Sequence, residues 1–191
     1  TDGSVRETNR WCLLFLSTGE LSLVEHAANV GEKTYAGVEV RMIQIPSDTG
    51  KHGVFEELHG FAGGKALAEH LEQSVMLSHG APFREWLRCL TADLPGMTSK
   101  AKAMLKEFTR RLTPDNAGNQ VGRAVTRFAL VAMAGELATE AGITGWQPGE
   151  AYNAAKSCLD AWMYDRGHTA NQEDAAALEQ VRDFMTRNQY S

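Results

Sequence analysis

The sequence predicts an α/β fold that becomes mainly α: a partial parallel sheet with few strands, followed by a helical bundle. Residues 11–17 form a continuous apolar run of strand length, as in strands buried on both faces. Residues 38–45 are rich in β-branched side chains and end at Pro46. After Gly63 almost every segment has a helical pattern. We therefore expect an α/β segment over 1–62 and a helical domain over 63–191.

The parallel sheet is predicted from the segment between the two strands. Residues 21–30 have a helical pattern, with Ser22 at the N-cap position and Glu25 three residues later, which is the spacing of a capping box. A strand, a helix and a strand in this length match a βαβ unit. Two strands alone leave both sheet edges uncovered. Either the sheet recruits further strands, or the chain is a piece of a larger protein.

The helices expected in the second domain each have one apolar face. They cover residues 65–79, a segment that begins at Pro82, and residues 99–112, 119–141, 149–164 and 173–188. The segment 119–141 is the longest and most apolar. Its small residues, among them Ala132 and Gly135, permit close approach of neighbouring helices. We expect this helix at the centre of the bundle.

Composition favours an ordinary protein of the cytoplasm. The net charge is −5 and the isoelectric point about 5.7. Autonomous DNA-binding modules usually have a basic face, so this composition makes such a module less expected. No apolar run is long enough to cross a bilayer, and the first residues lack the apolar core of a signal peptide. The three cysteines lie far apart, as is typical of reduced core thiols. We expect a cytoplasmic protein without membrane partners.

The known catalytic motifs are incomplete. The segment GFAGGKA, residues 60–66, resembles a phosphate-binding loop, but His59 replaces its first glycine and Ala66 its hydroxyl residue. The segment FLSTG has Phe15 where a nucleophile elbow needs glycine. The histidines are not at metal-ligand spacing. A self-contained small-molecule enzyme is therefore the least favoured interpretation.

Polar residues follow the first predicted strand, at Ser17, Thr18, Gly19 and Glu20. Ligands of parallel sheets bind beyond the carboxyl ends of strands, so these side chains can contact a phosphate or an attacking water. The same residue types also form helix-capping turns. Sequence spacing favours neither interpretation over the other.

Three arginines are further candidates. Arg41 lies within the second predicted strand, where a charge must pair or project beyond the sheet. Arg123 and Arg127 are four residues apart and share a helix face, so they can bind a phosphate, a cofactor or the carboxylates of a neighbour. A solvated or internally paired face remains the alternative.

Five blocks of sequence occur in an order that matches a known family. They are WCLLFLSTGELSLVEH, KTYAGVEVRMIQIP, FEELHGFAGGKALAEHL, QVGRAVTRFALVAMAGELATEAGITGW and EAYNAAKSCLDAWMYDRG. Together they resemble the family called domain of unknown function 927, found in bacterial proteins of phages, plasmids and integrative elements. Its members are often described as helicase-like or primase–helicase proteins. The resemblance extends from Trp11 to about Asn188.

The resemblance implies the C-terminal portion of a RecA-like or AAA-type ATPase. The P-loop and the magnesium-binding strand would lie upstream, so ATP and magnesium belong to the longer protein and no cofactor is expected in this chain alone. Ser17, Thr18 and Glu20 then resemble a sensor strand that faces the γ-phosphate. Arg41 resembles an arginine that reaches nucleotide across a subunit interface. Arg123, in the QVGRA block, resembles a phosphate or subunit contact.

The resemblance also implies the partners. These are the upstream ATPase half of the same protein, further copies in a ring, and nucleic acid bound through the full-length protein during DNA replication of a mobile element. Alternatively, the chain is a non-catalytic helical interaction module or a truncated derivative. In neither case is it expected to hydrolyse ATP alone.

Overall fold

The computed structural model describes residues 13, 15–32, 36–167, 180–182 and 184–187. The chain divides into two compact units, residues 1–34 and residues 35–191. The first unit contains helix α1 (Leu23–Asn29). Ser22 accepts a hydrogen bond from the Glu25 N–H and the Glu25 carboxylate accepts one from the Ser22 N–H, which confirms the predicted capping box.

The second unit contains the other named helices. They are α2 (Ala36–Glu39), α3 (Gly64–Leu77), α4 (Ala81–Ala92), α5 (Leu94–Leu112), α6 (Asn119–Glu140) and α7 (Glu150–Arg166). Residues 180–182 and 184–187 are also helical. The rest of the helix predicted over 173–188 lies outside the described residues. Helix α5 begins five residues before the predicted Ser99, because Asp93 caps it and Pro95 occupies its first turn.

The predicted parallel sheet is wrong. In the part of the chain that the structure describes, no strand forms, and the extended pairing is limited to an isolated bridge between His52 and Phe55. Residues 13 and 15–17 have no regular structure, and residues 38–45 begin in α2 and continue as an irregular segment. β-Branched side chains favour a strand only where a neighbouring strand can pair with its backbone. The described residues supply no such neighbour.

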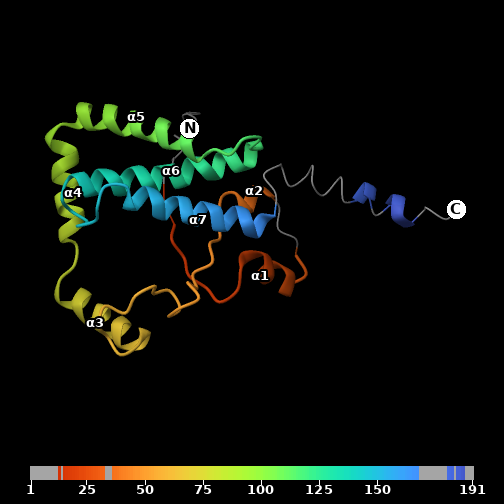
Figure 1. Cartoon of the computed structure of the whole chain (residues 1–191), viewed down its shortest axis with the longest axis horizontal. Coiled ribbons are helices and arrows are strands. Elements are labelled where there is room, and N and C mark those ends of the chain that lie inside the picture. The colour runs from red at the N-terminus through yellow and green to blue at the C-terminus, as the bar shows by residue number, and fades with distance from the viewer. Residues whose placement is uncertain (1–12, 14, 33–35, 168–179, 183, 188–191) are drawn as a thin grey trace, which may run out of the picture. The chain divides into compact units, whose positions relative to one another are not determined.

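Helix α6 is the centre of the helical core, as predicted. It lies alongside both α5 and α7 (Figure 1). The core is built from side chains of all three helices: Phe108, Leu112, Val121, Ala124, Val125, Phe128, Ala129, Ala132, Met133, Leu137, Tyr152, Ala155, Leu159 and Trp162. Small side chains on the buried face of α6 allow its neighbours to approach.

Helices α6 and α7 approach closely at Gly135. A Cβ atom added to Gly135 would lie 2.5 Å from the Cβ of Ala151, a distance that real Cβ atoms do not reach. A glycine is therefore required at this point for the two helices to pack as they do.

The next residue of α6 holds the start of α7. Glu136 is only 7% exposed, and its carboxylate accepts hydrogen bonds from the Gly149 N–H at 2.8 Å and the Tyr152 N–H at 2.9 Å. Gly149 precedes α7 with a φ of 93°, which glycine adopts without strain. The first N–H groups of a helix lack intrahelical partners and carry positive partial charge. Glu136 therefore satisfies two of them.

Helix α3 packs against the loop before it. Leu67 is buried, and the Phe61 ring lies 4.9 Å from the His70 ring. At the far end of α3 the large apolar side chains Met76 and Leu77 are exposed. Helix α3 therefore presents apolar surface that the described residues leave uncovered.

Replacing Gly135 with alanine should destabilise the helical unit. The new methyl group must push α6 away from Ala151, and such overpacking costs about 1–3 kcal/mol. Gly122→Ala on the same helix is the matched control, because no atom lies within 4 Å of its added Cβ. That variant should gain about 0.5–1 kcal/mol from alanine's helix propensity. Urea denaturation measures both, and an equal effect of the two changes would contradict the close approach.

Glu136→Gln should weaken the junction between α6 and α7. The amide offers one acceptor oxygen for two N–H groups, so one buried donor is left unsatisfied and the charge is lost, at a cost of about 1–3 kcal/mol. Glu140→Gln is the control, since Glu140 makes an exposed ion pair with Lys100 and its loss should cost about 1 kcal/mol or less. A larger loss of unfolding free energy at Glu140 than at Glu136 would argue against the cap.

Candidate functional site

The residues predicted as a sensor strand precede α1. Ser17, Thr18 and Glu20 are exposed and lie in a segment without regular structure. They do not cap the helix, because that role belongs to Ser22 and Glu25. Their predicted contact with a γ-phosphate stays a prediction, since it needs a partner outside the unit formed by residues 1–34.

Arg41 lies in the helical unit and is not part of a strand. It follows α2, is exposed, and donates a hydrogen bond from its guanidinium Nη1 to the Gly37 carbonyl oxygen at 3.3 Å. The placement of Arg41 within a strand is therefore corrected. Its guanidinium is held by its own helical turn.

Arg127 fixes the segment that carries Arg41. The Arg127 guanidinium donates a hydrogen bond from α6 to the Val40 carbonyl oxygen, and Val40 itself is only 3% exposed. Ile43, two residues after Arg41 in the sequence, packs against the helical core. The structure therefore brings Arg41 next to the part of α6 that carries Arg127. Arg123 is exposed one helical turn before Arg127.

Sequence reasoning missed a fourth arginine at the same part of α6. Arg166, at the end of α7, donates a hydrogen bond to the side-chain oxygen of Gln120 and lies over the Trp162 ring, with its guanidinium carbon 5.4 Å from the ring centroid. Gln120, Arg123 and Arg127 are spaced i, i+3 and i+7, so they share one face of α6. We call Arg41, Arg123, Arg127 and Arg166 the arginine row. The sequence indicates that Gln120 shares a helix face with Arg123 and Arg127. Only the structure shows that Gln120 is hydrogen-bonded to Arg166.

The first part of helix α6, which carries two arginines of the row, contains no carboxylate. The first carboxylate of α6 is Glu136, so the helix has none over its first 17 residues. The acidic residues closest to the row in sequence are Glu39, Asp115 and Asp165. Guanidinium groups bind the paired oxygens of phosphates and carboxylates with two parallel hydrogen bonds.

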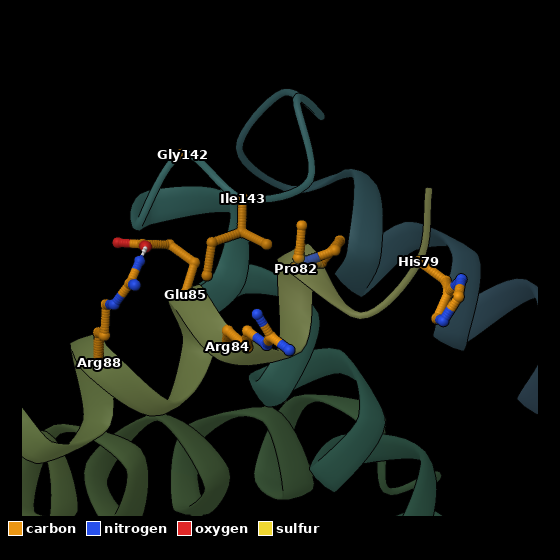
Figure 2. Close-up of a pocket in the computed structure, with 8 residues that line it drawn as sticks. His79, Pro82, Arg84, Glu85, Arg88, Gly142 and Ile143 are labelled. Atoms are coloured by element: carbon orange, nitrogen blue, oxygen red, sulfur yellow. Dashed lines mark hydrogen bonds and ion pairs between the residues drawn. The ribbon is translucent and has the colours of Figure 1, made fainter. Parts of the chain in front are cut away.

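A separate hollow of about 560 Å³ lies between α4 and the loop after α6 (Figure 2). Its lining residues are His79, Ala81, Pro82, Arg84, Glu85, Arg88, Gly142 and Ile143. Figure 2 shows Ile143 pointing toward α4 and the Glu85 carboxylate joined to Arg88, at 2.8 Å. This lining contains no serine, threonine, cysteine or lysine, so it offers no nucleophile of these types. The hollow has the volume of a small-molecule site.

A metal site requires several side-chain ligands that converge on one ion. No group of three or more His, Cys, Asp or Glu side chains within them could hold a metal ion. Lys65 of the glycine-rich segment forms an exposed ion pair with Glu69, 3.7 Å apart at the start of α3. No catalytic step through ATP is therefore assigned to this chain.

Comparisons of the chain with protein-family models, with curated proteins and with solved structures gave no match. Among the helices of the described residues, none is long and apolar enough to cross a membrane.

The capping box predicts that α1 loosens at low pH. The pKa of Glu25 is lowered from its ordinary value of 4.5, chiefly by the Ser22 N–H and then by the Ser22 side chain. A carboxylate with a depressed pKa stabilises the fold fully above its ordinary pKa, and this contribution is lost as the pH falls through the lower, folded value. The helical chemical shifts of Leu23–Asn29 should therefore decline below pH 4.5.

Two variants isolate the residue responsible. Glu25→Gln should remove this pH-dependent decline, whereas Glu20→Gln, which changes an exposed carboxylate outside the cap, should leave it intact. A decline that persists in Glu25→Gln would assign it to another group.

Proposed function

We propose that this chain is a helical, non-hydrolysing part of an ATP-driven helicase-like protein of mobile genetic elements. The proposal is carried by the assembly of Arg41, Arg123 and Arg127 at one part of α6, because Arg127 holds the Val40 carbonyl beside Arg41. An arginine held in position by the fold can stabilise the charge of a phosphoryl group bound elsewhere. The five sequence blocks shared with the helicase-like family supply the context.

In this proposal the P-loop, ATP and magnesium belong to another part of the longer protein. Arg41 contributes its guanidinium to a nucleotide bound there or in a neighbouring copy of a ring. Ser17, Thr18 and Glu20 contribute polar groups near the γ-phosphate. Leu13, Phe15 and Leu16, which directly precede them, are strongly exposed apolar side chains, at 67%, 81% and 97%. Apolar surface of this kind marks contact with further polypeptide.

A second candidate function is a non-catalytic interaction module. It is favoured by the exposed apolar side chains of α3, which are Leu71, Val75, Met76 and Leu77. Leu71 and Val75 are one helical turn apart, as in helices that dock into an apolar groove. The two candidate functions differ in whether Arg41 and Glu20 affect the rate of ATP hydrolysis.

Variants of the longer parent protein should lose ATP hydrolysis when these groups are removed. We expect Arg41→Ala to lower kcat by about 10³-fold, as removal of a trans-acting arginine does, and Glu20→Gln to lower it by about 10²-fold if the carboxylate acts as a general base or positions water. Steady-state phosphate release measures both.

Matched controls are Arg110→Ala and Glu72→Gln, which alter an exposed arginine and an exposed carboxylate elsewhere. They should retain the rate of the unaltered protein. Unchanged hydrolysis in both Arg41→Ala and Glu20→Gln would reject the ATPase role and leave the interaction module. Hydrolysis of ATP by the 191-residue chain alone would reject the non-hydrolysing assignment.

A further inference from the structure

We propose that the hollow between α4 and the loop after α6 binds a small organic carboxylate with an apolar body (Figure 2). The lining contains none of the residues assigned above to ATP hydrolysis, so the inference goes beyond the proposed function and does not depend on it. The volume of the hollow, about 560 Å³, lies within the range of pockets that hold small molecules. The charge and the apolar side chains of the lining select the ligand class.

The loop after α6 forms a wall of fixed shape. Gly142 adopts a φ of 71°, and its N–H donates to the Thr139 carbonyl oxygen at 2.9 Å. The Ile143 N–H donates to the Ala138 carbonyl oxygen, also at 2.9 Å, which completes the Schellman arrangement that ends many helices. The hydroxyl groups of Thr139 and Thr144 are hydrogen-bonded across the same turn, 2.8 Å apart. The turn therefore holds Ile143 in place, with its side chain directed toward α4 (Figure 2).

The apolar part of the lining comes from both sides of the hollow. Ala81 and Pro82 begin α4, and Ile143 faces this helix from the loop. Pro82 has no N–H group, so the first turn of α4 presents carbon atoms rather than a donor at this residue. Pro82 is exposed and Ile143 is half-buried. An aliphatic or aromatic group placed between them would remove apolar surface from water.

The lining carries one positive charge in excess. Apart from His79, its charged groups are the two arginines Arg84 and Arg88 and the carboxylate of Glu85. Arg88 donates a hydrogen bond to Glu85 at 2.8 Å, so these two charges compensate each other. The Arg84 side chain forms no hydrogen bond or ion pair within the described residues, and Figure 2 shows it beside Ile143. The guanidinium fork of Arg84 is therefore available to the paired oxygens of a carboxylate.

This charge balance favours a monoanion. One carboxylate neutralises the guanidinium of Arg84, whereas a dianion brings a second negative charge that the Glu85–Arg88 pair does not match. The Nδ1–H of His79 is already engaged, since it donates to the Val75 carbonyl oxygen at 3.1 Å. A carboxylate on an apolar body satisfies both parts of the lining: its oxygens contact Arg84 and its carbon atoms contact Pro82 and Ile143.

Titration of the 191-residue chain with benzoate tests the proposal, with the backbone amide chemical shifts of α4 and of residues 142 and 143 as the readout. A ligand of about nine non-hydrogen atoms and ordinary ligand efficiency should bind with a Kd of about 0.5–10 mM. Benzamide keeps the shape and loses the charge, and inorganic phosphate keeps the charge and loses the apolar body. Each should bind at least about fivefold more weakly than benzoate.

Two variants separate the guanidinium from the apolar wall. Arg84→Gln should weaken benzoate by about tenfold, because it removes charge-assisted hydrogen bonds, and should leave benzamide unchanged. Ile143→Ala should weaken benzoate and benzamide alike, by about threefold to tenfold, because it removes apolar contact from both. Lys102→Gln is the matched control. It removes an exposed cation of α5 outside the lining and should alter the Kd of benzoate less than about twofold.

Several results would overturn the proposal. They are equal weakening of benzoate by Arg84→Gln and Lys102→Gln, equal affinity for benzoate and benzamide, and shifts confined to residues outside the lining. Phosphate bound as tightly as benzoate would overturn the ligand class in favour of a simple anion. No saturable shift up to the solubility limit of benzoate would overturn the site itself. Binding is measured without ATP, so its outcome is separate from the effect of Arg41→Ala on hydrolysis in the parent protein.

Discussion

The helical unit depends on one buried carboxylate. Glu136 accepts hydrogen bonds from two N–H groups at the start of α7, so the side chain of one helix fixes where the next one begins. A buried charge is costly unless it is hydrogen-bonded, and these donors also carry the positive end of the α7 dipole. Gly135, beside it, removes the side chain that would separate α6 from α7. The hydrogen bonds of Glu136 and the close contact at Gly135 together determine how α6 and α7 pack.

This packing divides α6 into two parts with different roles. Its C-terminal half contains Gly135 and Glu136, which join it to α7. Its N-terminal half contains Gln120, Arg123 and Arg127. Gln120 accepts a hydrogen bond from Arg166 at the end of α7, and Arg127 donates one to the Val40 carbonyl oxygen in the segment after α2. Because the distal part fixes the helix pair, the arginines project from a rigid support. Preorganised cations lose little conformational freedom when an anion binds.

The sequence predicted the helices well because their signals are local. Ser22 and Glu25 form a capping box within one turn, and the small residues of α6 correctly predicted its central position. It failed for the sheet because a strand requires a partner, and apolar or β-branched runs do not supply one. Ile43 shows the alternative, since it packs against the helical core from an irregular segment, in which Val40 is also buried. The site was only partly predictable for the same reason: Arg123 and Arg127 share a helical period, whereas Arg41 and Arg166 reach them through tertiary contacts.

The way each arginine is paired bears most directly on function. An arginine that only stabilises a surface helix is commonly paired with a carboxylate one turn away, as Arg110 is with Glu107. Arg127 instead contacts a main-chain carbonyl 87 residues earlier in the chain, and Arg41 contacts that of Gly37. These contacts position the guanidinium groups through neutral main-chain acceptors.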